Sequence, residues 1–96
     1  MITRTGDRLQ IAGSVTMATV SALFNEGLKP RENGGVTVDF AKIEKVDSSA
    51  VSLMLVWMRE AQRNKARLSF INVPDNLLSL AKLYGVAELL TLSTAE

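Results

Sequence analysis

Asp47, Ser48 and Ser49 stand together in the middle of the chain, just before a long apolar-rich segment that begins at Val51. A carboxylate or hydroxyl oxygen in that position can accept a hydrogen bond from a free backbone N–H, which stabilises a helix start by about 1 kcal/mol. A serine there can also carry a phosphate, because unpaired N–H groups and the positive end of the helix dipole stabilise the anion. The same phosphate would repel an acidic partner. The three residues therefore suit a helix cap, a binding switch, or both.

Residue types needed for much enzymatic chemistry are missing, since the sequence has no cysteine and no histidine. This excludes thiolate and imidazole metal sites, thiol nucleophiles and any Ser-His dyad. Asp39 and Asp47 could lie near each other, but they complete neither a metal-ligand set nor an acid/base pair. Gly34 and Gly35 lack the following Lys-Ser/Thr pair of a phosphate-binding loop. We predict a protein that is not an enzyme and takes no cofactor or metal; a small hydrolase, a metal enzyme or a nucleotide-binding domain is a weaker alternative.

Charge and hydropathy limit the partners. The net charge is +1 and the Lys and Arg residues are scattered, whereas a nucleic-acid surface needs a basic patch. Residues 51–58 are mostly apolar, but a membrane-spanning helix needs roughly 20 such residues. The N-terminus has no apolar stretch of signal-peptide length. We expect one domain over residues 1–96 that is cytoplasmic, binds no nucleic acid and does not insert directly into a membrane.

Hydrophobic periodicity predicts the elements that position these residues. They are a hairpin of strands 3–5 and 8–12, a helix capped by Thr16, a strand 36–40, a link 41–46, the central helix from 51, a strand 67–73, a helix started by Pro74 and an optional edge strand 89–92. Strands separated by helices give a mostly parallel sheet. The sequence thus predicts an α/β fold with a sheet of four to five strands, an N-terminal hairpin and about three helices.

The central helix carries more apolar residues than one face can hold. The stripe at helical spacing that we expect to face the sheet comprises Val51, Met54, Leu55, Met58, Ala61 and Gln62. Leu53, Val56 and Trp57 fall on flanking faces. A helix apolar over most of its circumference is either covered on both sides or part of an interface. We expect Leu53 or Trp57 to be partly exposed and to contact a partner; the alternative is that both belong to the core.

The segment 36–56 resembles the STAS domain (sulphate transporter and anti-sigma-factor antagonist). The resemblance rests on an apolar strand followed by a short loop and the run Val46-Asp47-Ser48-Ser49-Ala50-Val51, and it extends over nearly the whole chain. It implies a STAS-like fold. In the anti-sigma-factor antagonists of that family, a kinase modifies a serine in the motif Asp-Ser-Ser/Thr-Gly. Ser49 matches that serine, and Ala50 replaces the usual glycine.

A second segment, 80–86, resembles the STAS subunits of Gram-negative Mla phospholipid transporters, which maintain outer-membrane lipid asymmetry. The residues that carry this resemblance are Leu80-Ala81-Lys82-Leu83-Tyr84-Gly85-Val86. It implies a cytoplasmic subunit that binds the transporter's ABC ATPase and is peripheral to the inner membrane through that partner. In that subgroup the hydroxyl important for binding directly follows the Asp, which corresponds to Ser48. Ser49 and Ala50 depart from the Gly-rich remainder of the subgroup's loop.

Two functions follow from these observations. The first is an interaction module that binds and regulates the ABC ATPase of a phospholipid transporter. The second is an anti-sigma-factor antagonist that binds an anti-sigma-factor kinase and is switched by phosphorylation of Ser49, or else of Ser48. In both cases the predicted partner-binding residues are Asp47, Ser48, Ser49, Leu53 and Trp57.

Overall fold

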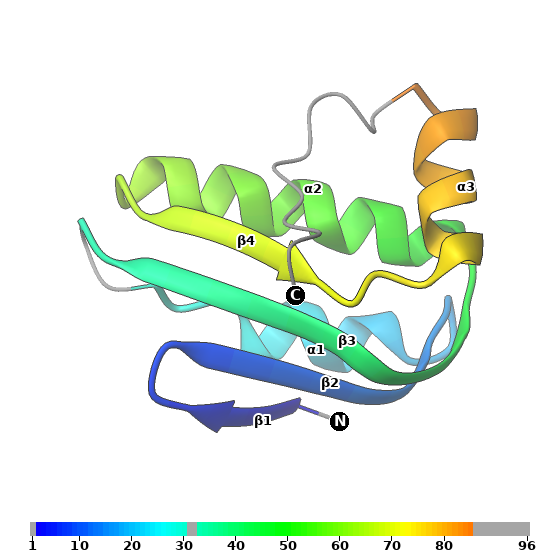
Figure 1. Ribbon diagram of the computed structural model, residues 1–96, viewed down its shortest axis with the longest axis horizontal. Helices are drawn as coiled ribbons and strands as arrows, with labels where there is room; N and C mark the ends of the chain where they lie inside the picture. Colours follow the sequence, from blue (N-terminus) through cyan, green and yellow to red (C-terminus); the bar gives the residue numbers. More distant parts are fainter. Residues whose placement is uncertain (1, 31–32, 86–96) are drawn as a thin grey trace.

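The computed structural model describes residues 2–30 and 33–85 (Figure 1). Their elements, in chain order, are β1 (Ile2–Thr5), β2 (Arg8–Val15), α1 (Val20–Glu26), β3 (Gly35–Val46), α2 (Ser48–Arg63), β4 (Arg67–Ile71) and α3 (Asp75–Leu83). This order confirms the predicted α/β class, the N-terminal hairpin and the helix started by Pro74. The predicted edge strand 89–92 lies outside the described residues.

The four described strands form one sheet in the order β1-β2-β3-β4. β1 pairs antiparallel with β2, whereas β2, β3 and β4 run parallel. Helices α1 and α2 connect the parallel strands and lie on the same side of the sheet (Figure 1). Crossovers between parallel strands are almost always right-handed, and two of them that run in the same direction along the sheet place both helices on one face.

The core lies between the sheet and these helices. Alternate residues of the parallel strands are buried there, as the two-residue period of a strand requires: Leu9, Ile11, Val36, Val38, Phe40, Leu68 and Phe70. The rings of Phe40 and Phe70 on neighbouring strands stack with centroids 5.9 Å apart. Residues of α1, α2 and α3 complete the same cluster, so all three helices contribute to a single core.

The predicted link 41–46 is wrong, because these residues continue β3. They keep a backbone partner in β2 as far as the pairs Ser14–Lys45 and Val15–Val46. The two strands keep this pairing through register shifts between Gln10 and Ala12 and between Gly13 and Ser14. Such irregularities bend a strand and increase its twist. As a result β3 delivers the chain directly to Asp47.

The first helix also starts later than predicted. Thr16 does not cap it; instead the carbonyl oxygen of Thr16 accepts hydrogen bonds from the N–H groups of Thr19 and Val20 at 2.9 and 2.8 Å. The Thr19 hydroxyl accepts from the Thr16 N–H at 3.0 Å and donates to the Ser14 carbonyl at 2.8 Å. These bonds close residues 16–19 into a turn, which we call the 16–19 turn, and α1 begins only at Val20.

Candidate functional site

Asp47 caps α2 and also contacts the 16–19 turn. Its backbone is extended, and its Oδ1 accepts from both the N–H and the hydroxyl of Ser49, at 2.9 and 2.5 Å. Its Oδ2 accepts from the N–H of Met17 at 3.0 Å. The predicted capping role is therefore confirmed for Asp47. The hydrogen bonds from the Ser49 hydroxyl, the Met17 N–H and the Ser49 N–H lower the pKa of Asp47 below the usual aspartate value, so the carboxylate is ionised at neutral pH.

The two serines after Asp47 differ in access. Ser48 is exposed, whereas Ser49 is only 5% exposed and its hydroxyl is engaged by Asp47. Ser48 can therefore meet a docking protein without any rearrangement. A kinase that modified Ser49 would first have to break the hydrogen bond between its hydroxyl and Asp47.

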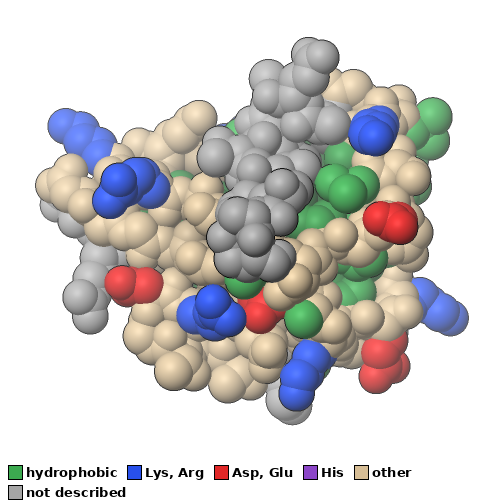
Figure 2. All heavy atoms as spheres, in the orientation of Figure 1, with side chains coloured by type: hydrophobic (Ala, Val, Ile, Leu, Met, Phe, Trp, Pro, Cys, Tyr) green, Lys and Arg blue, Asp and Glu red, His purple; other side chains and the backbone are tan. Residues whose placement is uncertain are grey.

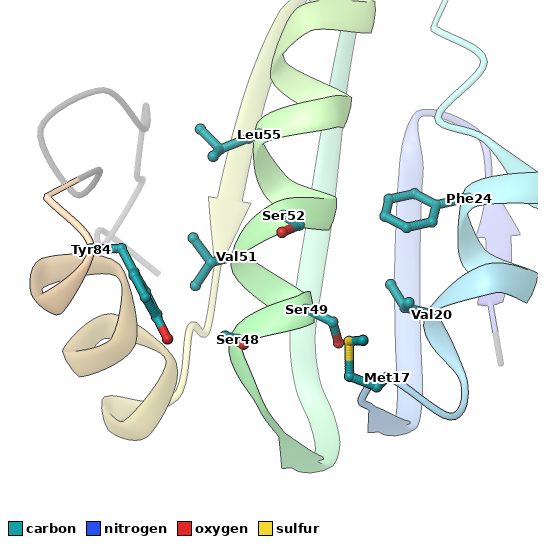
Figure 3. Close-up of a pocket in the computed structure, with 9 residues that line it drawn as sticks. All are labelled: Met17, Val20, Phe24, Ser48, Ser49, Val51, Ser52, Leu55 and Tyr84. Atoms are coloured by element: carbon teal, nitrogen blue, oxygen red, sulfur yellow. The ribbon is translucent and has the colours of Figure 1, made fainter.

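A groove of about 490 Å³ opens beside these serines, and we call it the α1–α2 groove. Its lining residues come from the 16–19 turn, α1, α2 and the end of α3: Met17, Val20, Phe24, Ser48, Ser49, Val51, Ser52, Leu55 and Tyr84. Figure 3 shows the three serines along α2, with Met17 and Phe24 on one side and Tyr84 on the other. None of these nine side chains is charged, so the groove offers apolar surface and hydroxyl groups to an occupant.

Several of the groove residues leave large apolar surfaces open. The Met17 side chain is 74% exposed, and Phe24 and Tyr84 are also exposed. Exposed apolar surface of this kind marks interaction sites in many proteins. Figure 2 shows the other face of the molecule, on which the strands lie in front of α1 and α2, and hydrophobic side chains gather there on the side that carries α3.

The expectation that Leu53 or Trp57 is partly exposed is wrong. Leu53 is 0% and Trp57 1% exposed, and both belong to the core cluster. The physical reason is that α2 is covered on several sides, since it packs on the sheet and contacts α1 and α3 as well. Leu53 and Trp57 therefore hold the helix in place, and a direct contact with a partner would require the core to open.

The predicted sheet-facing stripe of α2 is also partly wrong. Val51, Met54 and Ala61 are buried as expected, but Gln62 is exposed and Leu55 lines the groove. Five groove residues were not predicted to bind a partner: Met17, Phe24, Ser52, Leu55 and Tyr84. One signal was present. Ser52 interrupts the apolar run four residues after Ser48, which places both hydroxyls on one face of a helix.

Asp39 lies apart from this site and has a structural role. Its Oδ1 accepts from the Ala41 N–H at 2.9 Å and from the Asn72 side chain at 3.0 Å, and its Oδ2 lies 3.5 Å from the Arg8 guanidinium. Burial favours the neutral acid, but the hydrogen bonds from Asn72 and Ala41 and the charge of Arg8 outweigh it and lower the pKa of Asp39. Asp39 thus joins β3 to the end of β4 and shares no described hydrogen-bond partner with Asp47.

In residues 2–30 and 33–85, no three His, Cys, Asp or Glu side chains are grouped so that they could hold a metal ion. Within the same ranges, none of the helices combines the length and the hydropathy needed to cross a bilayer.

Comparison with known proteins identifies the family. Residues 1–91 match the family model described as "Mlab, STAS domain". The solved structure of the anti-sigma-factor antagonist SpoIIAA in its unphosphorylated form is 17% identical, with a TM-score of 0.65 over 100% of this chain and 87% of that one. At this identity the likeness shows a common fold. A search of curated proteins found no match. On the family match over nearly its whole length, the chain belongs to the STAS domain family, of the MlaB type.

Proposed function

We propose that the chain is a non-enzymatic interaction module that docks onto another protein through the α1–α2 groove and the exposed Ser48. The single observation that carries this proposal is the groove itself, an uncharged concave surface with exposed apolar residues at its rim and hydroxyls along α2. STAS domains serve as protein-interaction modules in MlaB and in anti-sigma-factor antagonists, which agrees with this role. Apolar anchors in such a surface commonly dominate the binding energy.

The partner that we propose is the ABC ATPase subunit of a phospholipid transporter that maintains outer-membrane lipid asymmetry. The match of residues 1–91 to the MlaB-type family model supports this choice. The domain would be cytoplasmic and peripheral to the inner membrane, held there by the ATPase, and it would regulate the assembled transporter. Because the groove has no charged lining residue, the complementary surface of the ATPase should present apolar side chains flanked by hydrogen-bonding groups.

Co-purification with the ATPase tests the proposal. Met17→Asp and Ser48→Glu each add a carboxylate at the groove without touching the core, and we expect either change to weaken binding by about tenfold or more. Leu83→Asp is the matched control, because Leu83 is as exposed as Met17 (76% against 74%) but does not line the groove. Undiminished binding of both groove variants would contradict the proposal. Equal losses in all three variants would remove the support for the groove in particular.

The second candidate function is an anti-sigma-factor antagonist switched by phosphorylation. The observation that favours it is the placement of Ser49, which matches the modified position of that group's motif and lines the groove beside Asp47. A phosphate on Ser49 would face the Asp47 carboxylate and would change the charge of the groove. Intact-mass measurement of protein from native cells tests this function. A species heavier by one phosphate, together with binding to an anti-sigma-factor kinase, would favour it, whereas a purely unmodified protein under all growth conditions would reject it.

A further inference from the structure

Asp47 links two segments that lie thirty positions apart in the sequence. One carboxylate oxygen accepts two hydrogen bonds from Ser49 at the start of α2, and the other accepts the N–H of Met17 in the 16–19 turn. The Asp47 N–H also donates to the carbonyl of Val15 at 3.2 Å, directly before that turn. The start of α2 and the 16–19 turn are therefore tied together at the mouth of the α1–α2 groove.

The hydrogen bonds within the 16–19 turn do not involve Met17, so they do not fix its position relative to α2. Thr16 and Thr19 close the turn by hydrogen bonds to each other and to Ser14. The Met17 side chain is mostly exposed, so packing contributes little to its position. Among the described residues, the hydrogen bond from the Met17 N–H to Asp47 connects Met17 to the residue that caps α2.

We propose that Asp47 is a positioning residue for docking, which fixes the Met17 side of the groove relative to the Ser48 side through its Oδ2. The groove's role as the docking surface is taken from the proposed function. The two oxygens of the Asp47 carboxylate then have different roles. Oδ1 caps α2, and Oδ2 holds the 16–19 turn in place before a partner binds. Ordering in advance lowers the entropic cost of binding.

Asp47→Asn separates the two tasks. Asparagine is about as good an N-cap as aspartate, because its side-chain oxygen can accept the same bonds. Its other terminal atom is an NH₂ group, which cannot accept from the Met17 N–H. Ser49 supplies two donors and Met17 only one, so the side-chain oxygen should stay with Ser49. The variant should therefore keep the cap and lose the link to the turn.

Two controls accompany this variant. Ser49→Ala removes the hydroxyl donor but leaves the Met17 N–H bonded to Asp47. Glu60→Gln makes the same carboxylate-to-amide change at the opposite end of α1, where Glu60 accepts from the N–H groups of Leu28 and Lys29 at 3.3 and 3.0 Å. Neither control should alter the Met17 side of the groove.

Two measurements test the proposal. Amide hydrogen exchange is monitored by NMR in the free protein, and the affinity of each variant for the ATPase is measured separately. In Asp47→Asn we expect exchange at Met17 to accelerate by about tenfold or more while the Ser49 amide stays protected, and binding to weaken by a similar factor. The Ser49→Ala and Glu60→Gln proteins should behave like wild type at Met17. Unchanged exchange at Met17 would overturn the proposal, and so would faster exchange with unchanged affinity. The exchange arm needs no partner, so failure of the docking function itself shows separately, as normal binding by Met17→Asp.

Discussion

At both ends of α1 a carboxylate accepts hydrogen bonds from backbone N–H groups, but the apolar side chain beside it is buried at one end and exposed at the other. At the end of the helix, the Glu60 carboxylate on α2 accepts from the backbone of Leu28 and Lys29, and the Arg4 guanidinium on β1 donates to the Leu28 carbonyl at 3.0 Å. At its start, the Asp47 carboxylate accepts from the backbone of Met17. Leu28 is completely buried, whereas Met17 is mostly exposed.

With the docking role proposed above, the two ends of α1 divide between stability and binding. At the Leu28 end, charged side chains on both sides satisfy the backbone around a buried apolar residue, which closes the core. At the Met17 end, the carboxylate orders a turn whose apolar side chain stays in solvent beside uncharged hydroxyls. Holding an apolar residue in solvent brings no folding benefit, so a docking role explains it better than stability does.

The largest expected effect compares a core residue of α2 with a groove residue. Trp57→Ala should lower the free energy of unfolding by about 3–5 kcal/mol, because it removes a large buried side chain and leaves a cavity. Met17→Ala should change it by less than about 0.5 kcal/mol. Urea denaturation followed by circular dichroism measures both. Equal small losses would show that Trp57 is not part of the core.

At the Leu28 end of α1, Glu60→Ala should cost about 1–3 kcal/mol of unfolding free energy, because it leaves the N–H groups of Leu28 and Lys29 without their acceptor. Affinity for the ATPase, measured at a temperature where the variant is folded, should remain that of wild type. A parallel loss of affinity would mean that both ends of α1 take part in docking, and the contrast between them would fail.

At the Met17 end, Asp47→Ala should cost about 1 kcal/mol of stability, the usual value of an N-cap. It should also weaken docking, because the link to Met17 is lost together with the cap. Calorimetric titration with the ATPase, beside the denaturation curve, checks both effects. If docking were lost only in proportion to stability, Asp47 would be no more than a helix cap.

The smallest effect concerns pH. Asp39 and Asp47 both have a lowered pKa in the folded protein, so each contributes stability above the ordinary aspartate pKa of about 3.9. That contribution is lost as pH falls through the lower folded values. Urea midpoints from pH 7 down to pH 3 should therefore decline below about pH 4 in the wild type. The decline should be shallower in Asp39→Asn, and an identical acid limb in that variant would argue against the ionised contacts of Asp39.

Much of the fold was predictable from residue patterns because each pattern reports a local preference. Strand alternation, the turn at Gly6 and the helix start at Pro74 all depend on neighbours in sequence. The continuation of β3 through Lys45 was not predictable in this way. It depends on pairing with β2, which is distant in the sequence. The residues of the segment 41–46 alone do not show that such a partner strand exists.

The candidate site was predictable only in part, for the same reason. The cap at Asp47 follows from residue types and position, but α2 begins at Ser48 and not at Val51 as predicted, so both serines lie in its first turn. Periodicity marked Leu53 and Trp57 as surplus to one helix face, but it could not show that α1 and α3 cover those faces. The groove is formed by segments that meet only in the folded chain, so Met17, Phe24 and Tyr84 gave no joint signal in sequence.

Broadening of backbone amide signals on titration of the isotope-labelled domain with the ATPase tests the central claim most directly. Docking in the α1–α2 groove predicts broadening first at the 16–19 turn, along α1 at Val20 and Phe24, along α2 from Ser48 to Leu55, and at Tyr84. The backbone near Leu28 and Lys29 should respond late or not at all. Broadening that begins near Leu28 and leaves the groove residues sharp would contradict the account.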